Sequence, residues 1–196
     1  MNKTKDYYEN NTEEFFDSTV SANVEYLYCD FLENVPQGGR ILDLGCGSGR
    51  DAKAFIEKGY SVTAIDGSQS LCEMAKEKLG IKVECLDFNE LNYQEEFDGV
   101  WACASLLHSS REKLPNIFNK IKNALVPNGV VYMSFKYGDF EGEKLGRFFL
   151  DLNEEKFEEI FQKTSGLEII KVWQSEDTRR EKDVLWLNVL LRRIEE

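Results

Sequence analysis

Apolar residues along the chain alternate between a helical spacing and a strand-like spacing. Apolar positions 24, 27, 28, 31, 32 and 35 recur three or four residues apart, which predicts an amphipathic helix over residues 22–34. The short apolar run over 40–44 is typical of a buried strand. Further helices are predicted from 51, 68 and 114, and further strands over 61–66, 97–103 and 130–135. This alternation favours a parallel sheet with helices on both faces.

The last third of the chain predicts a different connection. Asn153 is expected to cap a helix that stops before Gly166, and strands are predicted over 167–174 and 184–191. The loop 175–182 between these strands is too short for a parallel crossover, so the two strands are expected to pair antiparallel. Pro127-Asn128-Gly129 is predicted to form a turn ahead of the strand over 130–135. The expected fold class is α/β, with a mostly parallel seven-stranded sheet and a C-terminal antiparallel strand.

The most informative segment is the glycine-rich turn Gly45-Cys46-Gly47-Ser48-Gly49, which follows the first strand. Glycine accepts a positive φ and lets a ligand approach the backbone closely. In α/β sheets, a turn of this kind after a parallel strand is where nucleotide-like cofactors bind. Asp66 ends the next strand roughly 20 positions later, where a carboxylate can accept hydrogen bonds from two ribose hydroxyls. The chain is therefore predicted to bind a cofactor that contains adenosine.

The spacing of the glycines separates two kinds of cofactor. Dinucleotide-binding turns read G-x-G-x-x-G, whereas this turn reads G-x-G-x-G and is followed by Asp51, whose charge would repel a pyrophosphate. The run from Asp43 to Gly49, with Asp66-Gly67-Ser68 after the second strand, resembles the class I S-adenosylmethionine-dependent methyltransferases. Residues 83–88 agree with this resemblance, because they look like the third strand of that family, which ends in an acidic-aromatic pair, here Asp87-Phe88. The three pieces occur in order over residues 38–135.

This resemblance implies a Rossmann-like core over residues 37–196 and a helical cap over the cofactor at 1–36, in a single methyltransferase domain, 1–196. It implies that the glycine turn holds the methionine and ribose region, that Asp66 holds the ribose hydroxyls, and that Asp87 with Phe88 holds the adenine. In similar enzymes a tyrosine of the N-terminal segment contacts the methionine end. The cofactor-binding residues expected on these grounds are Tyr8, Gly45, Cys46, Gly47, Gly49, Asp66, Gly67, Asp87, Phe88 and Cys103.

His108 is the only histidine in the chain and follows the fourth predicted strand. Its ordinary pKa suits proton transfer near neutral pH, so it is a candidate catalytic base that takes a proton from the attacking atom. The alternative is a histidine that packs against the cofactor turn and orients its loop. Both readings stay open, because methyl transfer often depends on positioning more than on proton removal.

The charge of the chain bears on its partners. The formal net charge is −12, which disfavours nucleic acid as a partner. Cations at the carboxyl edge of the sheet could instead hold a carboxylate or phosphate of an anionic small-molecule acceptor. The candidate substrate-binding residues are Lys136, Tyr137, Arg147, Arg179 and Arg180. The alternative for each of them is a solvated charge or polar group on a loop.

The predicted function is transfer of a methyl group from S-adenosylmethionine to an oxygen, nitrogen or sulfur atom of a small molecule, which releases S-adenosylhomocysteine. A methyltransferase acting on protein or RNA, a nicotinamide-dependent oxidoreductase and a non-catalytic cofactor-binding sensor are the alternatives. The five cysteines are scattered without a C-x-x-C pair, so neither a disulfide framework nor a metal site is expected. Such cysteines are typical of reduced thiols, so a cytoplasmic location is expected. No signal peptide or membrane span is expected.

Overall fold

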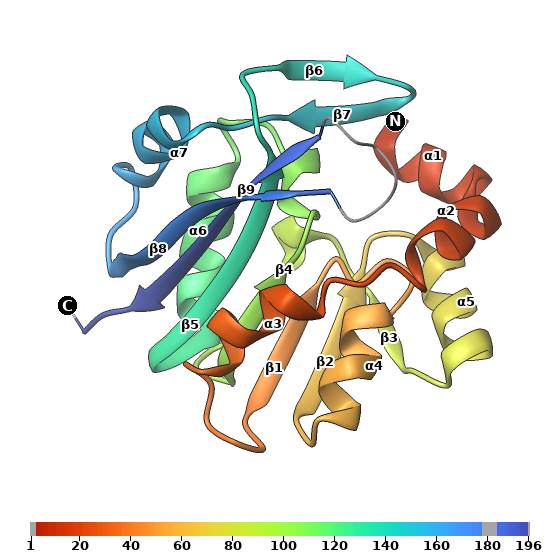
Figure 1. The fold of residues 1–196 in the computed structure, drawn as a ribbon, viewed down its shortest axis with the longest axis horizontal. Coiled ribbons are helices and arrows are strands. Elements are labelled where there is room, and N and C mark those ends of the chain that lie inside the picture. Colours follow the sequence, from red (N-terminus) through yellow and green to blue (C-terminus); the bar gives the residue numbers. More distant parts are fainter. Residues whose placement is uncertain (1–2, 178–183, 196) are drawn as a thin grey trace.

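The computed structural model describes residues 3–177 and 184–195 (Figure 1). Seven strands form one sheet in the order β3-β2-β1-β4-β5-β9-β8. The first five of these are parallel, and β9 lies antiparallel between β5 and β8. This arrangement confirms the predicted α/β class and the antiparallel C-terminal pair. The strands are β1 (Arg40–Leu44), β2 (Ser61–Asp66), β3 (Val83–Cys85), β4 (Phe97–Ala102), β5 (Leu125–Lys136), β8 (Leu167–Glu176) and β9 (Leu185–Arg193).

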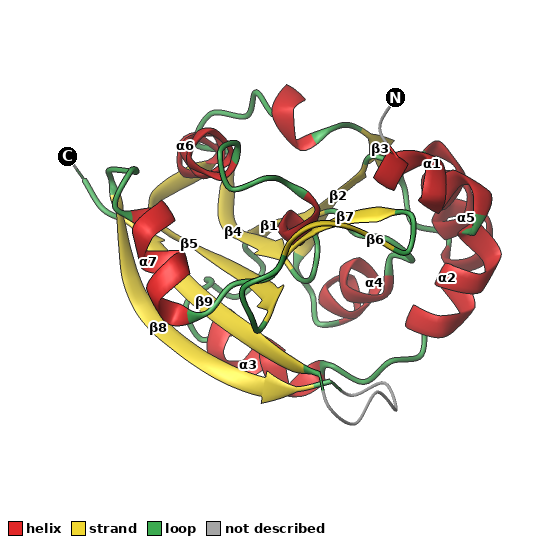
Figure 2. Cartoon of the chain, turned by 90° about the horizontal axis from the view of Figure 1, so that it is seen from above, coloured by secondary structure: helices red, strands yellow, loops and turns green. Residues whose placement is uncertain are grey.

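Helices cover both faces of the sheet (Figures 1 and 2). On one face, α6 (Leu114–Ala124) and α7 (Glu154–Phe161) bury Phe118 and Phe157 against the central strands. On the other face, α3 (Glu25–Leu32) and α4 (Arg50–Glu57) pack around Trp101. Helix α5 (Gln69–Leu79) lies beside β2 and β3. Its N-terminus is capped by Ser68, whose Oγ accepts a hydrogen bond from the backbone N–H of Leu71 at 3.3 Å.

The predicted turn at 127–129 needs a correction. Strand β5 already begins at Leu125, so these residues lie within the strand and not ahead of it. The turn-forming residues survive as an irregularity: Asn128 has a φ of +65°, and the pairing of β5 with β4 shifts register between Phe97 and Gly99. Residues 127–129 therefore form a bulge within β5 and not a separate turn, because the residues on both sides of them pair with β4.

Four elements gather above the carboxyl edge of the sheet. Helices α1 (Lys3–Asn10) and α2 (Thr12–Thr19) lie beside α5, and α1 also contacts a hairpin made of β6 (Glu141–Lys144) and β7 (Arg147–Leu150) (Figure 2). The hairpin was not predicted, because β6 is charged and the short apolar run at the end of β7 shows no alternation of apolar and polar residues. Short 3-10 turns at Phe88–Glu90 and Leu106–His108 complete this edge.

Candidate functional site

The glycine turn forms the floor of the site. Gly45 has a φ of +79°, and a Cβ built on it would lie 2.5 Å from the Cβ of Ser105. Only glycine fits a position that combines left-handed backbone with so close an approach. Gly49 (φ +77°) is the N-cap of α4, and a Cβ there would meet the side chain of Ala75 at 3.3 Å. Gly49 lines neither of the pockets described below, so its place in the structure is explained by helix packing.

On one side of this turn lies a pocket of about 150 Å³, which we call the Asp66 pocket. It contains the predicted ribose and adenine residues, together with an unexpected polar atom. The Oγ of Ser105 is buried and has no hydrogen-bond partner. An unsatisfied buried hydroxyl is costly, and a ligand with a polar edge would satisfy it. The lining residues include Tyr8, Gly45, Gly47, Asp66, Gly67, Ser68, Leu71, Asp87, Phe88, Asn89, Ser105 and His108.

Asp66 is held by backbone groups of two loops. Its Oδ2 accepts the N–H of Gly47 at 2.9 Å, and its Oδ1 accepts the N–H of Ser68 at 2.9 Å. Burial raises the pKa of Asp66, although these backbone hydrogen bonds oppose the shift. Each carboxylate oxygen can accept a second hydrogen bond, so the side chain keeps acceptor capacity toward the pocket.

Asp87 lies on the opposite wall and caps the 3-10 turn that carries Phe88. Its Oδ1 accepts hydrogen bonds from the backbone N–H and the side-chain amide of Asn89, at 2.9 and 2.7 Å. The carboxylate of Glu90 accepts the backbone N–H of Asp87 in return, at 3.1 Å. This reciprocal cap fixes the direction of the acidic-aromatic pair.

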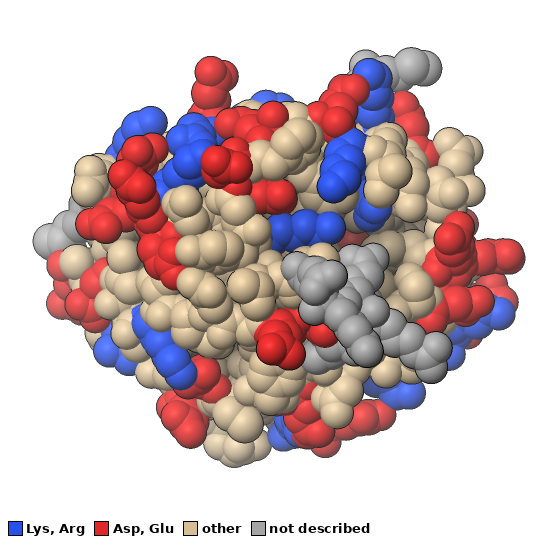
Figure 3. Space-filling model, turned by 45° about the horizontal axis from the view of Figure 1, so that its top comes forward, with Lys and Arg blue, Asp and Glu red and all other residues tan. Residues whose placement is uncertain are grey.

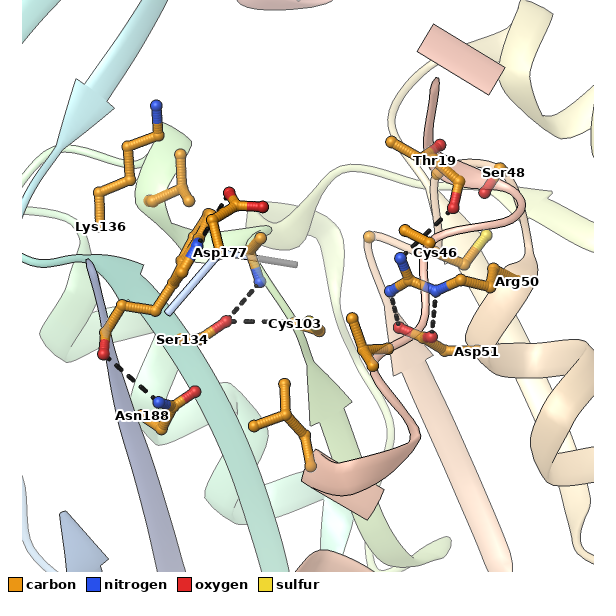
Figure 4. Close-up of a pocket in the computed structure, with 18 of the residues that line it drawn as sticks. Thr19, Cys46, Ser48, Arg50, Asp51, Cys103, Ser134, Lys136, Asp177 and Asn188 are labelled. Carbon is orange, nitrogen blue, oxygen red and sulfur yellow. Dashed lines mark hydrogen bonds and ion pairs between the residues drawn. The ribbon is translucent and has the colours of Figure 1, made fainter. Parts of the chain in front are cut away.

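On the other side of the turn lies a pocket of about 200 Å³, which we call the Asn188 pocket (Figure 4). Asn188 and Ser134 approach it from the sheet, and Arg50 and Asp51 approach it from the start of α4. The two pockets share six lining residues, which therefore form the boundary between them. These residues are Tyr8, Phe15, Gly45, Gly47, Ala104 and His108.

His108 is held by hydrogen bonds at both ring nitrogens. Nδ1 lies 2.7 Å from the backbone carbonyl of Phe148, which can only accept, so Nδ1 carries the proton. Nε2 is therefore the acceptor for the Tyr8 hydroxyl at 2.8 Å. Burial, with smaller contributions from the charges of Arg147 and Lys136, lowers the pKa of His108 to about 4. The ring is neutral at neutral pH, and its one free lone pair is engaged by Tyr8.

Arg50 and Asp51 form a buried ion pair at the Asn188 pocket. The guanidinium of Arg50 donates to both carboxylate oxygens, at 2.7 and 2.9 Å. The same carboxylate accepts the hydroxyl of Tyr28 at 2.6 Å and the indole N–H of Trp101 at 2.9 Å. Burial alone would raise the pKa of Asp51, but Arg50 and the hydrogen bonds outweigh it and hold the pKa below its usual range.

The five predicted substrate-binding residues separate in space. Lys136 and Arg147 line the Asn188 pocket. Tyr137 lines neither pocket, and its hydroxyl donates to the carboxylate of Glu154 at 3.0 Å. Arg179 and Arg180 lie outside the described residues. Among the predicted cofactor residues, Cys46 and Cys103 line the Asn188 pocket and not the Asp66 pocket.

Several lining residues were not among the candidates named from the sequence. Asn188 lies in an apolar strand, where a lone amide could have been noticed as a buried polar group. Its Oδ1 accepts the hydroxyl of Tyr132 at 2.7 Å. Phe149 belongs to the unpredicted hairpin. Phe15 approaches Gly47 so closely that a Cβ there would lie 3.0 Å from its ring.

The N-terminal helices are tied to both sides of the site. The carboxylate of Glu9 accepts the backbone N–H groups of Gln69 and Ser70, at 2.8 and 3.2 Å, at the start of α5. At the other end, the Thr4 hydroxyl accepts the backbone N–H of Phe148 at 2.9 Å. Helix α1 therefore bridges the Asp66 pocket, from α5 to the β6–β7 hairpin.

Comparison with known proteins shows what the site resembles. Residues 41–129 match the family model of a methyltransferase domain, which covers less than half of the chain. The glycine turn, Asp66 and Asp87 all fall within that match. This segment is therefore similar to a methyltransferase domain.

Two curated relatives match part of the chain. A putative methyltransferase of Bacillus subtilis, YqeM, is 32% identical over 117 residues, which cover 54% of this chain and 47% of YqeM. The ubiquinone biosynthesis O-methyltransferase of Coxiella burnetii is 33% identical over 106 residues, which cover 50% of this chain and 44% of the relative. The chain thus spans less than half of the length of either relative.

Solved structures share the fold over almost the whole chain. The 1,6-didemethyltoxoflavin-N1-methyltransferase of Burkholderia thailandensis, solved with its substrate and S-adenosylhomocysteine, has a TM-score of 0.79 at 18% identity. That match covers 97% of this chain and 87% of the other. The [4+2]-cyclase SpnF has a TM-score of 0.75 at 18% identity and covers 98% and 95%. Because a cyclase shares the architecture, the fold alone does not define the reaction.

Among residues 3–177 and 184–195, no group of three or more His, Cys, Asp or Glu side chains could hold a metal ion. No helix in the same ranges is long and apolar enough to cross a membrane.

Proposed function

We propose that this protein transfers the methyl group of S-adenosylmethionine to an oxygen, nitrogen or sulfur atom of a small molecule bound in the Asn188 pocket. The observation that carries the proposal is the pair of pockets joined through Tyr8, Gly45 and His108. One pocket has the ribose and adenine residues of the family, and the other offers a separate chamber for an acceptor. The proposed unit is a single domain, 1–196, in which α1 and α2 cover the cofactor.

The residues of the Asp66 pocket fit the cofactor. Asp66 has acceptor capacity for ribose hydroxyls, Asp87 and Phe88 suit the adenine, and the buried hydroxyl of Ser105 lacks a partner. The backbone of Gly45 and Gly47 borders both pockets, which suits the methionine end. S-adenosylmethionine supplies a methyl group on a sulfonium centre, so the protein has to align the nucleophile and exclude water.

We assign His108 a positioning role in place of a base role. A catalytic base needs a free lone pair and a pKa near the working pH. The Nε2 lone pair of His108 already accepts the Tyr8 hydroxyl, and burial holds the pKa of the ring at about 4. His108 instead fixes the Tyr8 ring at the boundary between the pockets. Aromatic faces attract a sulfonium cation by about 0.5–2 kcal/mol per contact.

The proposed acceptor is a small molecule that carries a negative charge, because Lys136 and Arg147 line its pocket. The names of the toxoflavin and ubiquinone methyltransferases, which act on small molecules, support a small acceptor. The five free cysteines support a cytoplasmic location, where thiols stay reduced.

The first experiment is a calorimetric titration of the protein with S-adenosylmethionine, S-adenosylhomocysteine and NADH. We expect both adenosyl ligands to bind and Asp66→Ala to weaken them at least tenfold, about 1.4 kcal/mol. Asp17→Ala removes an exposed carboxylate from α2 and is the matched control, with unchanged affinity expected. Binding of NADH without the adenosyl ligands would contradict the proposal and favour an oxidoreductase.

Turnover is tested separately with a methyl-labelled donor and a metabolite extract. Labelled product together with S-adenosylhomocysteine is the expected result. Affinity for the donor without turnover on any fraction would instead support a cofactor-binding sensor. Label that appears only in protein or RNA would move the acceptor to a macromolecule.

A further inference from the structure

Two cations lie against one aromatic ring in the Asn188 pocket. The Nζ of Lys136, at the end of β5, is 5.0 Å from the centre of the Phe149 ring. The guanidinium carbon of Arg147, at the start of β7, is also 5.0 Å from that centre. The ring of His108 packs on Phe149 as well, with 5.0 Å between the ring centres. Two different strands, β5 and β7, thus bring like charges together beside the boundary of the two pockets.

Arg147 differs from the other arginines in its partners. Six arginines lie in the described part of the chain, and the other five each form an ion pair with a carboxylate; these are Arg40, Arg50, Arg111, Arg192 and Arg193. Arg147 forms no ion pair with a carboxylate of the described residues; it packs on aromatic rings, and its Nη1 lies 3.5 Å from the Tyr8 hydroxyl. Its Nε is buried and has no hydrogen-bond partner. A buried guanidinium N–H without an acceptor is costly unless a ligand provides one.

Lys136 is also without a carboxylate partner. No Asp or Glu oxygen of residues 3–177 and 184–195 lies within 4.0 Å of its ammonium group. The chain has 36 acidic and 24 basic residues, so carboxylates are abundant and two unpaired cations in one pocket stand out. Figure 3 shows Lys and Arg atoms near the centre of the view, with acidic atoms both close to them and farther out.

The rest of the pocket indicates what else the ligand carries. Apolar side chains face part of the same space, which suits a hydrocarbon or aromatic body, and Glu176, Asp177 and Asn188 line the remainder together with other polar residues. A simple inorganic ion would leave the apolar surface without contacts. The apolar lining residues include Val24, Leu27, Leu107, Phe149 and Trp186.

We propose that Lys136 and Arg147 form an anion subsite that selects, as methyl acceptor, an organic acid with an apolar body. The Nε of Arg147 and the ammonium group of Lys136 donate to the acid group beside the Phe149 ring. The subsite rejects amines in their ammonium form, because a third positive charge would be repelled. This inference deepens the proposed function and rests on it for the statement that the bound acid is the methyl acceptor.

The test uses benzoate as the probe, with benzamide as its neutral isostere and inorganic phosphate as an anion without an apolar body. Each is titrated into wild-type protein, both with and without saturating S-adenosylhomocysteine. We expect benzoate to bind at least tenfold more tightly than either benzamide or phosphate. Equal binding of benzoate and benzamide would overturn the subsite, and equal binding of phosphate would overturn the organic-acid class.

Variants then assign the effect to the two cations. Lys136→Gln is expected to lower the affinity for benzoate at least tenfold and to leave the affinity for benzamide unchanged. Lys163→Gln removes an exposed lysine after α7 and is the matched control, with benzoate affinity unchanged. Arg147→Lys keeps the charge but loses the Nε donor. Its affinity for benzoate is therefore expected to lie between those of the wild type and Arg147→Gln. Unchanged benzoate affinity in Lys136→Gln would overturn the proposal.

The design also separates this inference from the proposed function. Arg147 packs on Tyr7 and Tyr8, so its substitution can lower the stability of the fold, and thermal melts of the Arg147 variants measure this effect. Lys136 does not pack on these tyrosines, so Lys136→Gln tests the subsite without this effect. Failure of S-adenosylhomocysteine to bind the wild type would contradict the proposed function. The benzoate titration without the nucleoside would still report on the anion subsite.

Discussion

Tyr28→Phe tests the buried network that anchors the start of α4. The hydroxyl of Tyr28 donates to the carboxylate of Asp51 at 2.6 Å, and Asp51 is 6% exposed. A hydrogen bond to a charged group contributes about 1.5–3 kcal/mol, and the Phe ring preserves the packing on Phe55 and Trp101. Arg50 and Trp101 still hold Asp51, so the loss is expected to stay below the roughly 3–5 kcal/mol of a broken buried ion pair.

The matched control is Tyr132→Phe. The hydroxyl of Tyr132 donates to the neutral Oδ1 of Asn188 at 2.7 Å, and its ring stacks on Trp101 with 4.0 Å between the ring centres. Both changes remove one buried hydroxyl from an aromatic ring. A neutral pair contributes about 0.5–1.5 kcal/mol, so Tyr28→Phe should cost about 1 kcal/mol more. Urea unfolding at pH 7 measures both free energies of unfolding, and the m-value reports whether the denatured state has changed.

The pH dependence provides a second readout. Because the folded pKa of Asp51 is lowered, its stabilisation is present above the unfolded pKa, about 3.9, and is lost as the pH falls through the folded value. The extra cost of Tyr28→Phe should therefore shrink in acid, whereas that of Tyr132→Phe should not. Equal costs for the two variants at pH 7, with no divergence in acid, would refute the view that Asp51 is a buried charge.

Three further outcomes are expected. The lowered folded pKa of His108 stabilises the native state above the unfolded pKa, and this contribution is lost as the pH falls from about 6.5 to about 4. His108→Gln should therefore remove this part of the pH dependence of stability, which urea midpoints across the range measure. An unchanged slope of stability against pH would contradict a neutral His108. Methyl transfer in the same variant should lose rate without a shift of its pH profile, whereas loss of the acidic limb, on which activity rises as a base deprotonates, would restore the base role. Glu9→Gln should speed proteolysis of the N-terminal helices and weaken the binding of S-adenosylhomocysteine, because Glu9 ties α1 to the start of α5. Glu13 is exposed, so Glu13→Gln should change neither the proteolysis rate nor the affinity.

Local patterns in the sequence account for the framework of the site. Alternating apolar runs predict the strands and helices, and three glycines at one-residue spacing predict the turn, because backbone conformation and burial depend on near neighbours. The short 175–182 connection predicts the antiparallel pair for the same reason. Asp66 and Asp87 were expected at the carboxyl edge, since parallel strands end there together. Both line the Asp66 pocket.

Tertiary structure alone decided how the two pockets are divided and charged. The Tyr8 hydroxyl meets His108 across 100 positions of sequence, and Arg147 meets Tyr8 across 139. Such contacts leave no periodic trace in the chain, because each partner satisfies its own local pattern regardless of the other. The charged β6–β7 hairpin, which brings Arg147 and Phe149 to the Asn188 pocket, has little apolar periodicity to announce it. Its position comes from packing against the N-terminal helices, which a sequence read element by element does not contain.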